Sequence, residues 1–372
     1  MSVSSAETGS AANAAGGRRT RSWIAVPALA ALVLPGVAAC GSSGSDGAQL
    51  ALTAALPDKV PSGTVLRLGD PSVQAALKAS GLQQELDDQG VDIQYANLSG
   101  GPETIEAFRA DKLDCGSVAD IPSLFAAWTG TSTKIVFESV TIDPLKHPIY
   151  QLGIAPGVSV RRLADLKGKK IAYSPGQAQG ALVLRVLKQA GLTKDDVKLV
   201  EMTSTEDSYV TALGSKAVDV APLGGALIPE YAAKYPGGST IYTGIRDDAS
   251  TLYCLTSSVQ DAGKAAALKK YVVARTKALL WENAHPDEYA KAYYQDVEGL
   301  DEADAKTTLE QDGTRGIPAN WDNAIDRLQE TADLLSTEQG HDKLDVATIV
   351  DRRFEKIEAK AAAGDVVRGD AS

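Results

Sequence analysis

Five short segments rich in glycine, serine and proline stand where strands are expected to end, and they hold the residues best suited to bind a small anion. They read GDPS, SGGPE, VADIP, SPGQAQG and PLGG, and they begin at residues 69, 99, 118, 174 and 222. Small side chains let a ligand approach backbone N–H groups closely, and N–H groups at the start of a helix attract negative charge. The segments therefore predict an anion site built largely from backbone.

Two carboxylates, Asp70 and Asp120, lie in these segments, each directly before the expected start of a helix. Proline is favoured near the first helical turn, and a preceding aspartate is a common helix cap. Alternatively, one carboxylate pairs with a cationic part of the ligand through a charge-assisted hydrogen bond. For a zwitterionic ligand we expect Asp70 to bind the ammonium group.

Signatures of catalysis do not appear in the sequence. His147, His285 and His341 are the only histidines, and none has Cys, Asp or Glu at metal-ligand spacing. No GxSxG motif is present, and GQAQG lacks the Lys-Ser/Thr of a phosphate-binding loop. We therefore predict a binding protein with no catalytic residues, no metal and no cofactor.

The elements around the five segments alternate between strand and helix. VLRLG and KKIAYS are apolar, strand-like runs, and each is followed by apolar residues at helical spacing that stop at Gly81 or Gly191. This alternation predicts the α/β class with mainly parallel sheets. Ligands of such sheets bind beyond the carboxyl ends of the strands, where the helices start.

An internal repeat relates two parts of the chain. Residues 104–120 align without gaps to residues 209–225, and the same offset of 105 places residues 65–74 on residues 170–179. About 300 residues follow Thr64, which is more than one core usually spans. We therefore predict two Rossmann-like lobes with one plan and a ligand cleft between them.

The N-terminal segment has the features of an export signal. Arg18, Arg19 and Arg21 precede an apolar run that ends at Cys40, after which the chain turns to Gly and Ser. The residues 37–40 resemble the bacterial lipobox, whose cysteine is acylated. We predict a lipoprotein signal peptide over residues 1–39, lipidation of Cys40, and a flexible tether over residues 40–63, with the Sec and Tat routes both open.

The charge balance excludes one class of partner. Residues 1–39 hold three of the 37 Lys and Arg and one of the 48 Asp and Glu, so the remaining chain has a formal charge of −13. A strongly negative protein repels nucleic acid and anionic membranes. We expect no nucleic-acid partner, and membrane contact only through the lipid.

Two cysteines, Cys115 and Cys254, remain in the mature chain. A disulfide between them is one option in an exported protein, two separate small core residues are the other, and the sequence does not decide between them. Trp128 and Trp281 lie on amphipathic segments and are expected to pack in the core.

Three stretches resemble solute-binding lipoproteins of ABC importers, in the branch that binds aliphatic sulfonates, taurine and nitrate. They are SGGPETIEAFRADKLDCGSVADIPSLFAA, LADLKGKKIAYSPGQAQGALVLRVLKQAGL and HPDEYA. Family members show a Gly-Pro pair at Gly101, Gly-Asp at residues 119–120 and Ser-rich residues at 174–179. This chain departs from the family in APLGGALIP, where members have a bulky Trp-Asp-Pro segment, and in GDPS, where they have an aromatic or Gln-bearing turn.

The resemblance implies a type II periplasmic-binding fold, with lobe 1 formed by residues 64–145 and 250–365 and lobe 2 by residues 146–249. The C-terminal helices would complete lobe 1, and hinge segments would lie near residues 143–151 and 244–252. The partners it implies are a small solute and an ABC permease and ATPase, with the chain acting as a monomer outside the cytoplasm. An enzyme of pyrimidine synthesis and a surface sensor share the fold and remain alternatives.

Sulfonates and taurine-like zwitterions rank first as solutes, with nitrate, bicarbonate and a thiamine pyrimidine as alternatives. The predicted ligand contacts all lie at strand ends: Asp70, Ser72, Ser99, Gly100, Gly101, Asp120, Ile121, Ser174, Gly176, Gln177, Gln179, Gly224 and Gly225.

Overall fold

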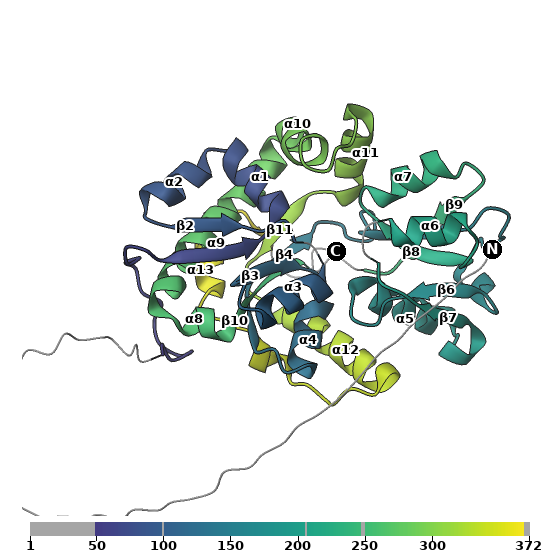
Figure 1. Cartoon of the computed structure of the whole chain (residues 1–372), viewed down its shortest axis with the longest axis horizontal. Helices are drawn as coiled ribbons and strands as arrows, with labels where there is room; N and C mark the ends of the chain where they lie inside the picture. The colour runs from purple at the N-terminus through teal and green to yellow at the C-terminus, as the bar shows by residue number, and fades with distance from the viewer. Residues whose placement is uncertain (1–48, 99, 205–206, 247–249, 368–372) are drawn as a thin grey trace, which may run out of the picture. The chain divides into compact units, whose positions relative to one another are not determined.

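The strands form two sheets (Figure 1). The computed structural model describes residues 49–98, 100–204, 207–246 and 250–367. The first sheet has seven strands in the order β12-β11-β4-β10-β3-β1-β2, and the second has five in the order β7-β6-β8-β5-β9. The strands of the first sheet are β1 (Val65–Gly69), β2 (Asp92–Tyr95), β3 (Cys115–Val118), β4 (Thr133–Thr141), β10 (Ser250–Leu255), β11 (Arg315–Pro318) and β12 (Val366–Val367). Those of the second are β5 (Tyr150–Ile154), β6 (Lys170–Tyr173), β7 (Lys198–Glu201), β8 (Val220–Gly224) and β9 (Ser239–Ile241).

Helices cover both faces of each sheet. Those encoded around the first sheet are α1 (Pro71–Ala79), α2 (Leu82–Asp88), α3 (Gly101–Arg109), α4 (Ile121–Trp128), α8 (Thr256–Gln260), α9 (Ala262–Ala284), α10 (Pro286–Tyr289), α11 (Glu302–Asp312), α12 (Asp322–Gln339) and α13 (Glu355–Ala361). Those of the second sheet are α5 (Ala178–Ala190), α6 (Ser208–Gly214) and α7 (Leu227–Lys234). A π-helix, η3 (Ala290–Gln295), follows α10, and the 3₁₀ turns are η1 (Leu163–Leu166), η2 (Lys194–Asp196) and η4 (Val346–Ile349). Among the described residues, none of these helices combines the length and apolarity needed to cross a membrane.

The two sheets share one plan, as the repeat predicts. In each, three parallel strands (β2-β1-β3 and β7-β6-β8) are followed by an antiparallel one, so the sheets are mixed and the prediction of mainly parallel sheets is wrong. Leu68 pairs with Cys115, and Ile171 pairs with Val220. Leu68 is therefore structurally equivalent to Ile171, whereas the ungapped alignment places it on Tyr173, two residues further along the strand. The connection from β6 to α5 has four residues, whereas the connection from β1 to α1 is the single residue Asp70.

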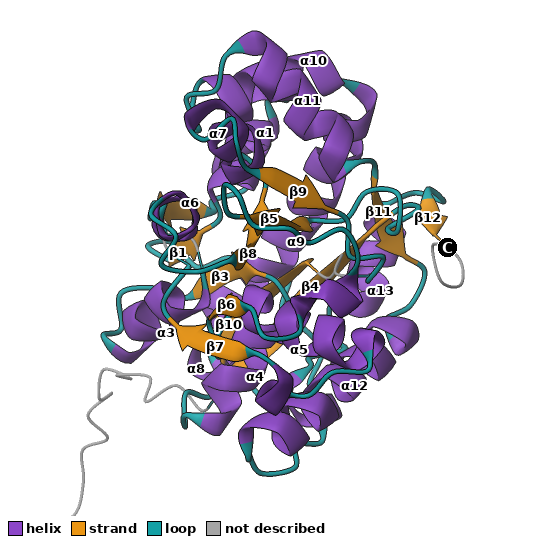
Figure 2. Cartoon of the chain, turned by 90° about the vertical axis from the view of Figure 1, so that its right-hand side faces the viewer, coloured by secondary structure: helices purple, strands orange, loops and turns teal. Residues whose placement is uncertain are grey.

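The long helix α9 covers one face of the first sheet, together with α1, α2 and α13. Helix α12 does more than complete the first lobe, because it packs against α5 of the second sheet. Its Ala332 and Leu335 join one apolar cluster with Ile121 of α4 and Val186 of α5. Figures 1 and 2 both place α10 and α11 at the top of the view and α12 near the bottom.

Part of the predicted tether is folded. The Leu50 backbone N–H donates to the Gln260 carbonyl at 2.7 Å, and Leu56 is buried in the core on the α9 side. The packed region therefore begins at least fourteen residues before Thr64. The predicted signal peptide and Cys40 lie outside the described residues.

The chain crosses from the first sheet to the second between β4 and β5, over residues 142–149, and returns between β9 and β10. These segments overlap the hinge regions expected at residues 143–151 and 244–252. Hinge motion there stays a prediction.

Cys115 and Cys254 form a disulfide, one of the two options that the sequence left open. They face each other directly in the antiparallel pairing of β3 with β10. Since 139 positions separate them in sequence, only the strand pairing reveals that they are neighbours. Because β10 follows the second sheet in the chain, the disulfide closes a loop that contains that whole sheet.

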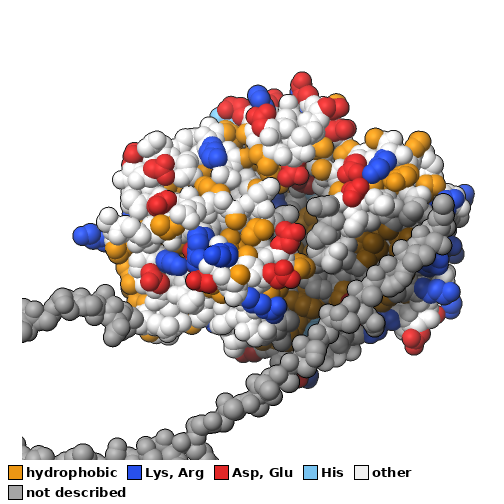
Figure 3. Space-filling model, in the orientation of Figure 1, with side chains coloured by type: hydrophobic (Ala, Val, Ile, Leu, Met, Phe, Trp, Pro, Cys, Tyr) orange, Lys and Arg blue, Asp and Glu red, His pale blue; other side chains and the backbone are white. Residues whose placement is uncertain are grey.

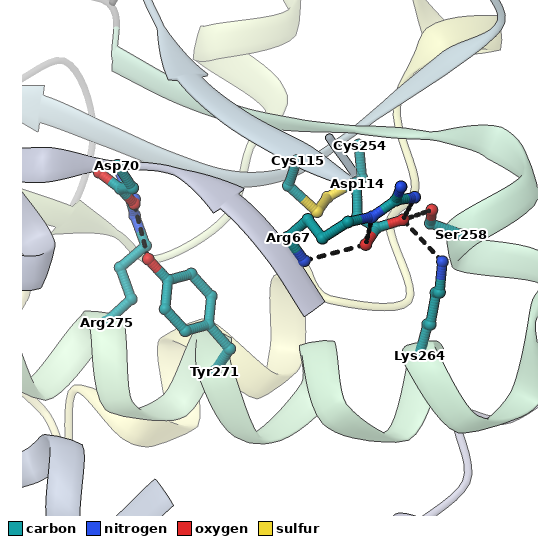
Figure 4. The surroundings of a disulfide bond; sticks show 9 residues. All are labelled: Arg67, Asp70, Asp114, Cys115, Cys254, Ser258, Lys264, Tyr271 and Arg275. Atoms are coloured by element: carbon teal, nitrogen blue, oxygen red, sulfur yellow. Dashed lines mark hydrogen bonds and ion pairs between the residues drawn. A yellow bond between two sulfur atoms is a disulfide. The ribbon is translucent and has the colours of Figure 1, made fainter. Parts of the chain in front are cut away.

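Beside the disulfide, the buried carboxylate of Asp114 holds several elements together (Figure 4). It accepts hydrogen bonds from Arg67 Nε at 3.0 Å, Ser258 Oγ at 2.7 Å and Lys264 Nζ at 2.8 Å. Burial would raise the pKa of this carboxyl, but the hydrogen bonds outweigh it and lower the pKa to about 2. The ionised Asp114 therefore ties β1 to α8 and α9.

Candidate functional site

A pocket of about 390 Å³ lies where the start of α3 meets the start of α5. It joins strand-end loops of both sheets, and four of the predicted contacts line it: Gly100, Gly101, Gln177 and Gln179. We call it the cleft pocket. Its remaining lining residues are Glu103, Val118, Ala119, Pro122, Tyr150, Ala178 and Ser204.

Glycine allows the walls of the cleft pocket to approach closely. A Cβ on Gly101 would lie 2.6 Å from Pro122 Cγ and 3.4 Å from the Gly176 carbonyl oxygen. Gly100 has a φ of +87°, which side chains other than glycine rarely adopt. Glycine is therefore required at position 101 by the close contact of α3 with α4 and with the turn before α5, and at position 100 by the backbone conformation.

Gln177 presents a fixed hydrogen-bond donor. Its side-chain oxygen accepts from the backbone N–H of Ser204 at 3.0 Å and from Ser204 Oγ at 2.9 Å. Because the oxygen is held on that side, the amide nitrogen faces Gly100, 3.8 Å from the position of a Cβ there. The side chain is 6% exposed, so its orientation is set by packing as well as by the hydrogen bonds.

The helix starts supply the electrostatics of the cleft pocket. The first N–H groups of a helix have no intrahelical partner, and neither α3 nor α5 has a side-chain cap. Two partial positive charges therefore meet at one hollow, an arrangement that suits an oxyanion. The exposed Glu103 lies at the edge, and of the lining residues only it and Tyr150 titrate.

Tyr150, the first residue of β5, is a lining residue that the sequence analysis did not identify. Gly224 of β8 makes room for it, since a Cβ there would lie 2.8 Å from the Tyr150 ring. The predicted contact Gly224 therefore acts through packing. The two residues are register partners in β5 and β8, a relation that no local sequence signal reveals.

Asp70 does not take either predicted role. Its carboxylate is fully buried, forms an ion pair with Arg275, and accepts from Tyr271 Oη at 2.7 Å (Figure 4). No side-chain hydrogen bond caps α1. The expectation that Asp70 binds a ligand ammonium in the cleft is therefore wrong, because α9 supplies the partners of this carboxylate.

Asp120 is likewise engaged elsewhere. Its Oδ2 accepts from Arg185 of α5 at 3.1 Å and from Thr331 of α12 at 3.3 Å. It does not cap α4 with its side chain. The ion pair instead connects the first sheet to the second beside the cleft pocket, which its neighbours Ala119 and Pro122 line.

Several of the other predicted contacts are engaged in hydrogen bonds or packing within the protein. Ser174 Oγ donates to the Met202 carbonyl at 2.6 Å and bonds to Tyr209 Oη. Ile121 is in the core, and Gly176 packs against the Phe125 ring. Gly225 does not line the cleft pocket, and Ser72 lines a different cavity, described below. Ser99 lies outside the described residues.

Comparison with known proteins places the chain in a family. The profile described as NMT1/THI5 like matches residues 86–288, more than half of the chain. The chain belongs to the NMT1/THI5-like family. The match includes α3, the cleft pocket and the second sheet.

Relatives of this NMT1/THI5-like chain carry the name aliphatic sulfonates-binding protein. One from Escherichia coli K12 is 32% identical over 114 residues, which cover 31% of this chain and 34% of that protein. One from Bacillus subtilis 168 is 24% identical over 290 residues, covering 76% of this chain and 84% of that protein. The chain thus spans about a third of the first relative and most of the second.

The fold is that of periplasmic binding proteins. The alkanesulfonate-binding protein SsuA from Xanthomonas axonopodis pv. citri, bound to MOPS, superposes with a TM-score of 0.64 at 23% identity, over 80% of this chain and 99% of that one. The desulfurization enzyme DszB shares the fold with a TM-score of 0.56 at 14% identity. The fold alone therefore does not separate binding proteins from enzymes.

Proposed function

We propose that this chain is the extracytoplasmic solute-binding component of an ABC importer, and that the cleft pocket binds a small organic anion. The observation that carries the proposal is that the starts of α3 and α5 face one hollow beside the Gln177 amide. The family match and the sulfonate-binding names of the relatives support it. We propose no reaction; Ser204 Oγ donates to the Gln177 side-chain oxygen, which is not a base.

A sulfonate is the head group that these donors favour. Its three oxygens accept several hydrogen bonds at once, which matches N–H groups that converge from two helices and one amide. A taurine-like zwitterion also fits, since Glu103 lies at the edge of the pocket and can pair with an ammonium. In this proposal Glu103 binds the ammonium group, which is the role predicted for Asp70 from the sequence.

Changing Gln177 tests the proposal. We expect Gln177→Ala to bind ethanesulfonate about tenfold more weakly, the loss of roughly one charge-assisted hydrogen bond. Gln177→Glu should abolish binding, because it places a negative charge against the anion. Isothermal titration calorimetry gives both values, and Gln84→Ala on the far helix α2 is the matched control.

The same titrations separate the alternative solutes. Nitrate, bicarbonate and the thiamine pyrimidine are tested beside ethanesulfonate and 2-aminoethanesulfonate on the unaltered protein. Binding of the neutral pyrimidine alone, or equal affinity of Gln177→Glu and parent for ethanesulfonate, would show that the pocket is not an anion site.

We further propose that Cys40 is lipidated, that the chain acts as a monomer, and that the anchored protein delivers solute to a permease and ATPase. The Arg-rich start, the apolar run and the Gly/Ser stretch after Cys40 support the anchor. Cys40→Ser should move the protein from the membrane pellet to the soluble fraction of fractionated cells, because one residue carries the lipid. Retention in the pellet would count against a lipid anchor.

A further inference from the structure

A second cavity, of about 670 Å³, lies beside the first sheet under α10, η3 and α11. We call it the lateral cavity. It shares no lining residue with the cleft pocket, and none of its lining residues belongs to the second sheet. The residues that line it and enter the argument below are Ser139, Arg275, Glu282, Tyr289, Tyr293, Tyr294, Asp312 and Arg315.

Two guanidinium groups form one side of the lateral cavity. Arg275 is 4% exposed, pairs with Asp70 and stacks on the Phe137 ring at 4.5 Å. Arg315 Nη2 donates to Ser139 Oγ at 2.7 Å. The Nε atoms of both arginines are buried and have no hydrogen-bond partner among the described residues. Both guanidinium groups line the cavity, so they place positive charge beside it and offer charged donors to an oxyanion.

Carboxylates and aromatic rings line the other part. Tyr289, Tyr293 and Tyr294 contact one another with ring centroids 5.0 to 5.9 Å apart, and Tyr294 Oη donates to Asp312 Oδ2. Burial raises the pKa of Glu282 to about 7 and raises the pKa of Asp312, although Arg315 opposes both shifts. Each carboxylate would gain from a nearby cation. Tyrosine faces also attract organic ammonium groups.

The outer surface over this cavity is acidic. Figure 3 shows acidic side chains gathered at the top of the view, where Figure 1 places α10 and α11. These helices carry Asp287, Glu288, Glu302 and Asp304 in their first turns. The resulting field favours a ligand with a positive group and repels a bare anion.

We propose that the lateral cavity is a second binding site, for a small zwitterionic solute. Its oxyanion would bind Arg275 and Arg315, and its ammonium would bind among Glu282, Asp312 and the three tyrosines. A bare anion would lie against the carboxylates, and a bare cation would lie against the two guanidinium groups. This site does not depend on the function proposed for the cleft pocket.

Calorimetry on the full chain tests the site, in the Gln177→Glu background so that the cleft pocket does not contribute. We expect that variant to bind 2-aminoethanesulfonate still, and to bind ethanesulfonate and ethylammonium much more weakly. Adding Arg315→Gln or Asp312→Asn should lower the affinity for 2-aminoethanesulfonate about tenfold each. Asp88→Asn, on the exposed side of α2 and outside the lining of the cavity, is the matched control and should leave it unchanged.

The outcomes are distinct from those for the cleft pocket. Loss of all 2-aminoethanesulfonate binding in Gln177→Glu, or equal affinity in all its lateral-cavity variants, would overturn the second site while leaving the cleft pocket intact. If a variant fails to fold, Tyr293→Ala replaces it, and a crystal structure of the unaltered protein with the probe shows directly whether the cavity is filled.

Discussion

Arg275→Met is expected to lower the free energy of unfolding by about 3–5 kcal/mol, the usual cost of leaving one partner of a buried ion pair without the other. Asp70 is fully buried, and after the change Tyr271 Oη, at 2.7 Å, would be the one remaining hydrogen-bond donor to its carboxylate among the described residues. Methionine keeps an unbranched apolar stem but not the guanidinium group, so the loss combines the charge with the contact of that group on the Phe137 ring. Urea denaturation followed by circular dichroism measures it.

A double-mutant cycle isolates the pair from other effects of the substitution. In the Asp70→Asn background, Arg275→Met should cost clearly less, because no buried carboxylate is then left unpaired. Lys306→Met, which breaks an exposed ion pair with Glu302 on α11, should cost less than about 1 kcal/mol. Equal costs for Arg275→Met in both backgrounds would mean that the ion pair does not stabilise the fold.

Replacing both Cys115 and Cys254 by serine is expected to lower the free energy of unfolding by about 2–5 kcal/mol. The disulfide closes a loop with a sequence separation of 139 residues, and a long loop gives a large entropic constraint on the unfolded chain in the loop-closure account. Thermal denaturation of parent and double variant gives the difference. A matching Tm for the two proteins would show that the bond adds no stability.

A reducing agent provides the control for this second prediction. Dithiothreitol should lower the Tm of the parent toward that of the double variant and should not change the variant. Because both cysteines are fully buried, reduction should become fast only as the protein opens. A Tm shift in the variant would mean that the reductant acts elsewhere.

The internal repeat shows which features of the fold can be predicted from local sequence patterns. Alternating apolar runs and Gly-rich turns locate the strands and helix starts of both sheets, because each pattern depends on residues close in sequence. The same patterns place Gly100, Gly101, Gln177 and Gln179 at strand ends, and the structure brings these four residues to one pocket. The family resemblance drawn from those segments is also confirmed.

Side-chain partners that come from distant segments could not be predicted from such local patterns. Asp70 and Asp120 stand where helix caps usually stand, yet their charges are neutralised by Arg275 and Arg185, which come from other helices. A buried carboxylate must find a cation or hydrogen-bond donor, and which one is near depends on how the helices pack. Tyr150 was missed for the same reason, because its position in the cleft pocket depends on the pairing of β5 with β8, in which it lies opposite Gly224.

Local sequence patterns were enough to predict the α/β class, the repeated plan of the two sheets and the glycine-rich helix starts of the cleft pocket, since backbone propensity and apolar periodicity act over a few neighbouring residues. The Cys115–Cys254 bond, the partners of Asp70 and the lateral cavity between Arg275 and Tyr294 became visible in the folded chain alone. Each of these depends on strand order and on the packing of α9 to α11, which join residues more than a hundred positions apart or close a cavity that no single element contains.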